Sequence, residues 1–160
     1  GKASVHELPL QQLCKPCAVI DIKDRAHATY LLSLADIKQF EAVHGSIQAD
    51  VIVLVNTGWA RFWNDAQAYR NNLQFPSISR EAADYLVSKN IAGLGIDTMS
   101  PDTPESGYPV HKLLLGANKF ILENVANLGQ MPQTGAFCLI APLKVEGATE
   151  APIRLIGLVL

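Results

Sequence analysis

The stretch DVIVLV, at residues 50–55, decides the fold class, because every position after its first is apolar. A strand with one solvated face alternates apolar and polar residues, whereas a strand covered on both faces reads as a continuous apolar run. DVIVLV therefore predicts an interior strand of a sheet that is covered on both sides.

Similar runs recur along the chain with helical or irregular segments between them. The other predicted strands are CAVIDI (17–22), IAGLGI (91–96), AFCLIA (136–141) and IRLIGLVL (153–160). One helix is predicted after the N-cap Ser33, ending at Gly45, and a second follows the N-cap Ser79. No linker divides the chain, so we expect a single α/β domain over residues 1–160, with a mixed β-sheet core flanked by helices.

Two irregular segments follow predicted strands directly and are the expected location of a site. They are NTGWARFWNDAQAYRNNLQFP (56–76) and DTMSPDTPESGYP (97–109). Loops that leave the carboxyl ends of strands usually carry the functional residues of α/β proteins. Attention therefore falls on Trp59, Asp97 and Ser100.

The segment HKLLLGANKFILENVANL, residues 111–128, contains a lone glutamate in a mostly apolar run. In one continuous helix, His111 and Glu123 would be about 18 Å apart along the axis and could not share a ligand. Gly116 is a natural helix stop, so a short helix opening near Pro109, a turn and a strand KFILENV (119–125) are predicted instead.

In such a strand, Glu123 lies between Ile121 and Val125 on one face. A buried carboxylate without a partner costs several kcal/mol or takes up a proton. A metal ion shared with His111, a bridging lysine or backbone amides would each serve as that partner. The alternative is a partly exposed glutamate on an edge strand, and the residues alone leave these possibilities open.

Several motifs together resemble the cyclase family of metal-dependent hydrolases, which includes the kynurenine formamidases (arylformamidases) and the isatin hydrolases. They are ELPLQQL…PCAVIDI, ADVIVLVNTGW, GLGIDTMSPD, HKLLL followed by ILENVANL, and the closing PL…G…APIRLIGLV. The resemblance implies a fold of the cyclase-like swivelling β/β/α type. It also implies homo-oligomers and a substrate that is a small aromatic or cyclic amide, such as N-formylkynurenine or isatin.

By the same resemblance, His111 and Glu123 match metal ligands, and the implied cofactor is a divalent metal, zinc or manganese. Asp97 and Ser100 match positions at a strand end near the substrate pocket, and Trp59 matches the aromatic residue of the TGW turn. Phe62 and Trp63 are candidates for an aromatic pocket, with core or interface roles as the alternative.

The family's strongest signature, H-x-G-T-H-x-D-x-P-x-H, is absent from these 160 residues. It supplies the other metal ligands and the acid/base histidine, which the resemblance places upstream of Gly1, so no catalytic residue is assigned. His6 aligns with a segment after that motif, and His27 and His44 lie in surface-like contexts. We expect an N-terminally truncated chain that is inactive alone, either a piece of a metal-dependent amide hydrolase or a non-catalytic relative acting as a binding or assembly module.

Three other chemical interpretations of the sequence have less support. CKPC (14–17) has the spacing of a redox motif but leads into a strand instead of opening a helix, and Cys138 lies alone in an apolar strand. GLGID (93–97) lacks the phosphate-binding lysine and the third glycine of a nucleotide site. A triad of Ser100, His111 and Asp97 lacks the G-x-S-x-G elbow.

The composition excludes several classes of partner. The net charge of −2 gives no reason to expect nucleic acid or an anionic membrane. No apolar run approaches the roughly 18 residues of a membrane span. Three cysteines do not form a secreted disulfide framework, which favours a reducing, cytoplasmic setting.

Overall fold

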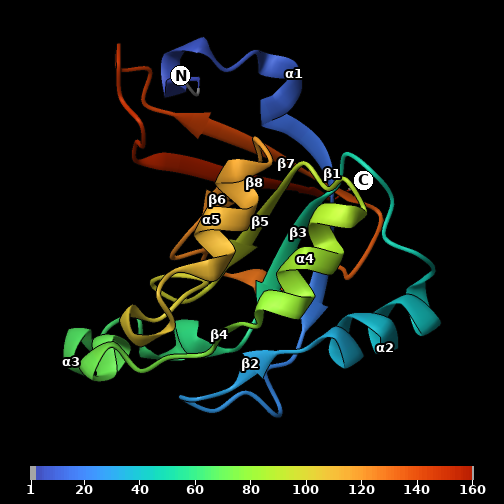
Figure 1. Ribbon diagram of the computed structural model, residues 1–160, viewed down its shortest axis with the longest axis vertical. Helices are drawn as coiled ribbons and strands as arrows, with labels where there is room; N and C mark the ends of the chain where they lie inside the picture. Colours follow the sequence, from blue (N-terminus) through green and yellow to red (C-terminus); the bar gives the residue numbers. More distant parts are fainter. Residues whose placement is uncertain (1–2, 160) are drawn as a thin grey trace.

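A six-stranded mixed sheet forms the centre of the protein, seen in a computed structural model that describes residues 3–159 (Figure 1). The strand order is β6-β5-β3-β1-β7-β8. The strands are β1 (Cys14–Asp21), β3 (Ile52–Asn56), β5 (Gly93–Ile96), β6 (Phe120–Leu122), β7 (Ala136–Pro142) and β8 (Ile153–Val159). Strands β6, β5, β3 and β1 run parallel to one another, whereas β7 is antiparallel to both β1 and β8. A smaller parallel pair joins β2 (Leu31–Leu32) to β4 (Ser77–Ile78).

Helices flank this sheet, which confirms the predicted α/β fold class. They are α1 (Leu10–Leu13), α2 (Leu34–His44), α3 (Ala66–Arg70), α4 (Arg80–Ser88) and α5 (Pro109–Gly116). Both predicted N-caps are present, since Ser33 accepts a hydrogen bond from Asp36 N and Ser79 accepts one from Ala82 N. Within residues 3–159, no helix is long and apolar enough to cross a membrane.

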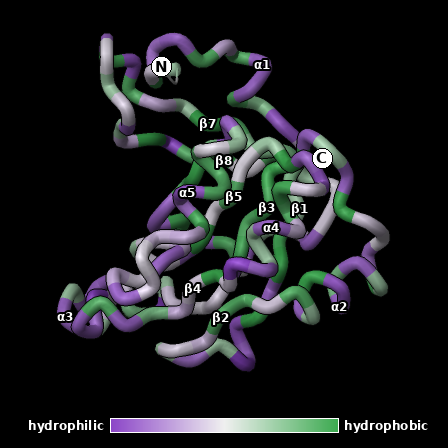
Figure 2. The backbone as a smooth tube through the Cα atoms, viewed as in Figure 1, coloured by the Kyte–Doolittle hydropathy of each residue, from purple (hydrophilic) through white to green (hydrophobic). Residues whose placement is uncertain are grey.

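The central strand β3 separates two apolar cores. Val53 and Val55 pack into the core formed with α2, α4 and α5, whereas Ile52 and Leu54 contribute to the core on the opposite face. All five β3 residues are buried, and Figure 2 shows apolar backbone segments concentrated in the central strands. This arrangement confirms the prediction made from DVIVLV.

The structure corrects the predicted extent of two strands. The strand expected over 119–125 ends at Leu122, because Asn124 adopts a left-handed φ of 58° and its N–H donates to the Thr98 carbonyl. Glu123 therefore lies in a turn beyond the carboxyl end of β6, not on a strand face. The first strand starts at Cys14 instead of Cys17, because residues 14–17 already pair with β7.

The carboxyl ends of β3 and β5 are tied together by Asp97, the first residue after β5. Its Oδ1 accepts hydrogen bonds from Thr57 N at 2.9 Å and Thr57 Oγ1 at 2.6 Å. Its Oδ2 accepts from Trp59 N at 2.9 Å and Ala60 N at 3.4 Å. Burial raises the pKa of this carboxyl, and the four donors oppose that rise. The turn after β3 is thus built around one buried carboxylate.

We predict that Asp97→Asn destabilises the fold by about 2 kcal/mol, because an amide nitrogen would then face buried N–H donors. Urea unfolding followed by circular dichroism measures the change. Asp24→Asn, at an exposed aspartate, is the matched control and should leave the unfolding midpoint unchanged. Equal midpoints for the two variants would contradict the role assigned to Asp97.

Candidate metal-binding site

The candidate site is built around His111, the third residue of α5. The buried carboxylate of Asp102, in the loop after β5, caps the start of this helix: Oδ1 accepts from Val110 N at 3.1 Å and Oδ2 from His111 N at 2.9 Å. The same Oδ2 lies 2.8 Å from His111 Nδ1. One carboxylate therefore holds both the helix end and the imidazole ring.

This contact determines which ring nitrogen of His111 is available to a ligand. The Asp102 carboxylate accepts a hydrogen bond from Nδ1–H, which leaves the lone pair of the neutral imidazole on Nε2. His111 Nε2 points at Glu123 and lies 3.5 Å from its Oε1. A histidine oriented by a carboxylate in this way is the usual arrangement of a metal-binding imidazole.

The Glu123 carboxylate occupies a partly desolvated position at the end of β6. Its side chain is 36% exposed. Burial raises its pKa above the ordinary value, while a hydrogen bond from the Ser100 hydroxyl and the proximity of His111 act in the opposite direction. Ser100 also accepts a hydrogen bond from Asp102 N at 3.2 Å. The loop after β5 thus contacts both Glu123 and His111.

The pair fits one side of a metal site. A neutral Nε2 and a carboxylate oxygen are both acceptors, so a proton or a cation between them is needed to make their contact favourable. Two ligands of a tetrahedral zinc with bonds of about 2.1 Å lie about 3.4 Å apart, close to the 3.5 Å seen here. Within the described part of the chain, no third His, Cys, Asp or Glu completes a ligand cluster.

Trp59 lies behind the site instead of at its surface. It is 4% exposed, packs edge-to-face on Phe62, and donates from its indole nitrogen to the Tyr69 carbonyl at 2.9 Å. The Tyr69 hydroxyl lies 3.0 Å from both the Asp97 carbonyl and Asn124 Oδ1 and shares its one hydrogen between these two acceptors. Burial, together with the charges of Asp97 and Glu123, raises the pKa of Tyr69 to about 12. Tyr69 therefore links Trp59 to the turn that carries Glu123.

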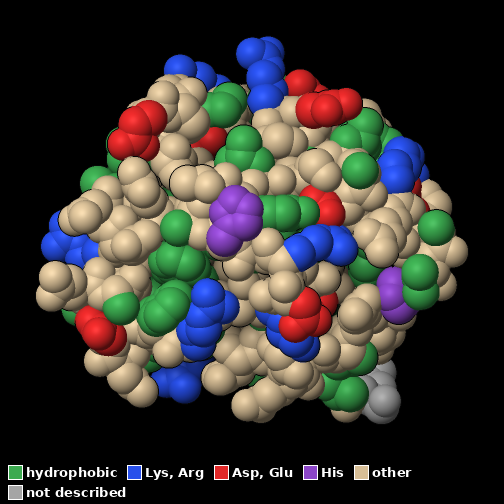
Figure 3. Space-filling view, turned by 90° about the horizontal axis from the view of Figure 1, so that it is seen from below, with side chains coloured by type: hydrophobic (Ala, Val, Ile, Leu, Met, Phe, Trp, Pro, Cys, Tyr) green, Lys and Arg blue, Asp and Glu red, His purple; other side chains and the backbone are tan. Residues whose placement is uncertain are grey.

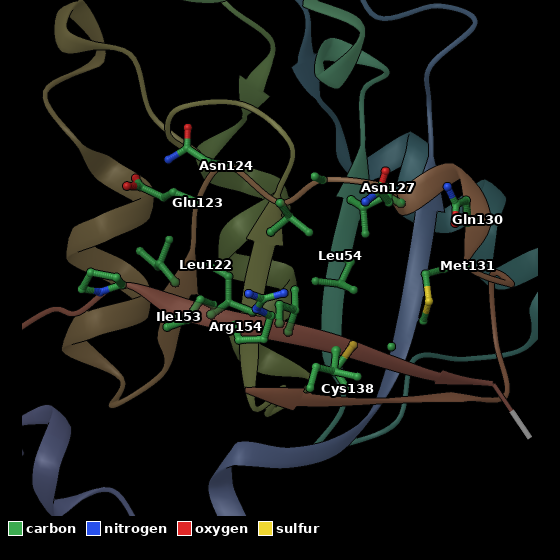
Figure 4. Close-up of a pocket in the computed structure, with 18 of the residues that line it drawn as sticks. Leu54, Leu122, Glu123, Asn124, Asn127, Gln130, Met131, Cys138, Ile153 and Arg154 are labelled. Atoms are coloured by element: carbon green, nitrogen blue, oxygen red, sulfur yellow. The ribbon is translucent and has the colours of Figure 1, made fainter. Parts of the chain in front are cut away.

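A cleft of 880 Å³ opens beside Glu123 on the sheet face opposite α4 and α5. In the close-up of Figure 4, Glu123 and Asn124 lie at one side of it, Leu54 and Leu122 near its centre, and Met131 at the other side. The cleft thus combines an apolar floor with one candidate metal ligand at its edge.

The structure separates the predicted site residues into two groups. Ser100, His111 and Glu123 come together, whereas Asp97 and Trp59 are buried and hold the neighbouring turn. It stays a prediction that a substrate contacts Trp59, Asp97 or Ser100 directly. The sequence analysis assigned no role to Asp102, although this residue is the last of the D-x-x-S-x-D pattern. It also assigned none to Tyr69, which lies in no recognised motif.

The remaining sequence candidates do not join this group. His27 and His44 are exposed, and the imidazole of His111 is held by Asp102, not by the Asp97 of the alternative triad. Trp63 is 53% exposed, with its ring 5.5 Å from that of Tyr69. On the face shown in Figure 3, acidic and basic side chains are interspersed and form no single-sign patch.

Comparison with curated proteins finds relatives named isatin hydrolase and kynurenine formamidase. The chain is 36% identical to the isatin hydrolase of Roseibium aggregatum over 163 residues, covering 95% of this chain and 62% of that protein. It is 30% identical to the kynurenine formamidase of Polaromonas naphthalenivorans, covering 98% of this chain and 63% of that protein. The chain thus spans less than two thirds of the length of these relatives.

Solved structures of isatin hydrolases are also similar to this chain. Isatin hydrolase A from Labrenzia aggregata, bound to benzyl benzoate, superposes with a TM-score of 0.92 at 34% identity, over 98% of this chain and 65% of that chain. An isatin hydrolase bound to the product analogue thioisatinate also gives a TM-score of 0.92, at 35% identity, over 98% of this chain and 64% of that chain. The Cyclase family model matches residues 1–103. The chain belongs to the cyclase family, whose relatives include metal-dependent hydrolases.

Proposed function

We propose that this chain forms part of a metal-dependent hydrolase site for small aromatic or cyclic amides, with His111 and Glu123 as metal ligands. The observation that carries the proposal is the 3.5 Å contact of His111 Nε2 with Glu123 Oε1, made while Asp102 holds Nδ1. The relatives named isatin hydrolase and kynurenine formamidase support the substrate class.

Each residue has a separate role in this proposal. His111 offers the Nε2 lone pair, and Asp102 keeps the proton on Nδ1 so that the lone pair stays available. Glu123 supplies a negative charge, and the Ser100 hydroxyl orients its carboxylate. The cleft beside Glu123, with Leu54 and Leu122 among its lining residues, leaves room for a ligand next to this pair.

A divalent cation, zinc or manganese, would supply Lewis acidity to this site, polarising a carbonyl and making water a nucleophile near neutral pH. Because a catalytic zinc normally has three protein ligands, two ligands give a weaker site than a complete one. Metal affinity is therefore the property that most directly tests the assignment.

His111→Ala and Glu123→Ala should each weaken Zn²⁺ binding by at least about 10-fold, since each removes one of the two proposed metal ligands. Isothermal titration calorimetry, after treatment with a chelator, measures the change. His44→Ala, at an exposed histidine on α2, is the control and should bind like the unmodified chain. Full affinity in both site variants would show that these residues are not ligands.

Asp102→Asn should move the His111 proton from Nδ1 to Nε2, because an amide N–H replaces the acceptor beside Nδ1. We expect metal affinity to fall about 10- to 100-fold, as is usual when the partner of a ligating histidine is lost. The ¹⁵N chemical shifts of the imidazole report the tautomer directly. A loss of stability with an unchanged tautomer would mean that Asp102 serves the helix end alone.

A second candidate function is assembly with another polypeptide, which the edge strand β8 favours. Its exposed residues include Ile153, Ile156, Leu158 and Val159, each at least 37% exposed. Open strand edges with apolar side chains are sites of pairing between chains. We therefore propose that β8 lies at the contact of a homo-oligomer.

The double variant Ile156→Lys, Leu158→Lys should convert such an oligomer to a monomer, because charges on the strand would be desolvated at the contact. Sedimentation velocity measures the mass. Val43→Lys, at an exposed residue of α2 and outside β8, serves as control. An unmodified chain that is monomeric, or a double variant of unchanged mass, would contradict this assembly.

A further inference from the structure

The backbone conformation of Tyr108 is unusual for a bulky residue. Nine non-glycine residues in the described part of the chain have positive φ, and seven of them are Asn or Asp, the types that tolerate the left-handed region best. The two exceptions are Leu73 and Tyr108, with φ of 64° and 60°. A left-handed conformation costs free energy for such residues, so each needs a reason.

Core packing accounts for Leu73 but not for Tyr108. The Leu73 side chain packs against the buried cluster of Trp59, Tyr69 and Phe75. Tyr108, by contrast, is 45% exposed and belongs to none of the apolar clusters of residues 3–159. Its backbone N–H donates to Ser106 Oγ at 3.3 Å, and its carbonyl accepts from Lys112 N at 3.2 Å. Any residue with a free N–H, asparagine and glycine included, would make these two bonds.

Among residues 3–159, the ring of Tyr108 has one aromatic neighbour, which is the imidazole of His111. The ring centroids of Tyr108 and His111 lie 5.8 Å apart with an interplanar angle of 86°, which is an edge-to-face contact. Because Tyr108 immediately precedes α5, the same short segment positions the candidate ligand and an exposed aromatic surface beside it. The strained backbone therefore places a partly exposed ring beside the imidazole of His111.

We propose that Tyr108 is a specificity-determining residue, whose ring forms one wall for the planar aromatic group of a ligand bound at His111 and Glu123. This inference rests on the proposed function, because it assumes that a ligand approaches these two residues. Aromatic pairs favour offset-stacked and edge-to-face arrangements, which hold a flat ligand better than a flexible aliphatic one. Tyr108 thus selects the ring of the substrate, whereas His111 and Glu123 serve the reacting group.

The test compares ligand affinity with stability in Tyr108→Asn. Asparagine suits the left-handed backbone and lacks the ring, so its thermal unfolding midpoint should equal or exceed that of the unmodified chain. Its affinity for thioisatinate, measured by titration in the presence of Zn²⁺, should fall between about 2- and 12-fold, the range given by single aromatic contacts. Its affinity for pyruvate, a carboxylate without a ring, should not change, and Tyr108→Phe should keep both affinities.

Leu73→Asn is the matched control, because it makes the same replacement at the other exceptional position. We expect it to lower the unfolding midpoint and leave thioisatinate affinity unchanged. If Tyr108→Asn behaves like Leu73→Asn, its ring serves the fold and the inference is wrong. If Tyr108→Asn binds thioisatinate as the unmodified chain does, the inference also fails while the proposed function stands. If the unmodified chain does not bind thioisatinate, the proposed substrate class fails, and the inference fails with it.

Discussion

Two buried carboxylates in one loop hold the candidate site together. Asp97 accepts four hydrogen bonds from the turn after β3, and Asp102 accepts three from the first residues of α5. Since a buried carboxylate tolerates few geometries that satisfy it, the loop between these residues has both ends restrained. Ser100 lies between them and reaches Glu123. The hydrogen bonds that these two carboxylates accept therefore fix the relative positions of β3, β5, α5 and the turn after β6.

The central strands β3 and β5 were predictable because they are covered on both faces, which makes their apolar runs continuous. The same pattern carries no information about where a strand ends when backbone conformation decides it. Leu122 is the last residue of β6 because Asn124 turns the chain across the end of β5. In this turn, Asn124 N donates a hydrogen bond to the Thr98 carbonyl and Val125 N donates one to the Ile96 carbonyl. An asparagine inside an apolar run was the only sign of this turn. Periodicity alone placed Glu123 on a strand face, where it does not lie.

The candidate site was predictable only in part, for a related reason. His111 and Glu123 were found through the family resemblance, and their 3.5 Å contact is consistent with it. Asp102 was visible in the sequence as a loop aspartate, but its role depends on the position of α5 relative to β5, which no local pattern specifies. Tyr69 contacts Asn124 and Tyr108 contacts His111, and such contacts between aromatic and polar residues leave no periodic pattern in the sequence.

Of the carboxylates of Asp97, Asp102 and Glu123, that of Glu123 has the fewest hydrogen-bond donors. This difference bears on the role of the His111–Glu123 pair. Asp97 accepts four hydrogen bonds and Asp102 three, whereas the partners of Glu123 are the Ser100 hydroxyl and the ring of His111. A glutamine would keep the bond to Ser100 and avoid the cost of desolvating a charge. A glutamate that served only the fold would therefore be poorly placed here. The cost is offset when a cation lies between the two acceptors, because it interacts favourably with both at once. A cation held between His111 Nε2 and Glu123 Oε1, as proposed above, would supply the compensation that hydrogen-bond donors of the chain give to Asp97 and Asp102.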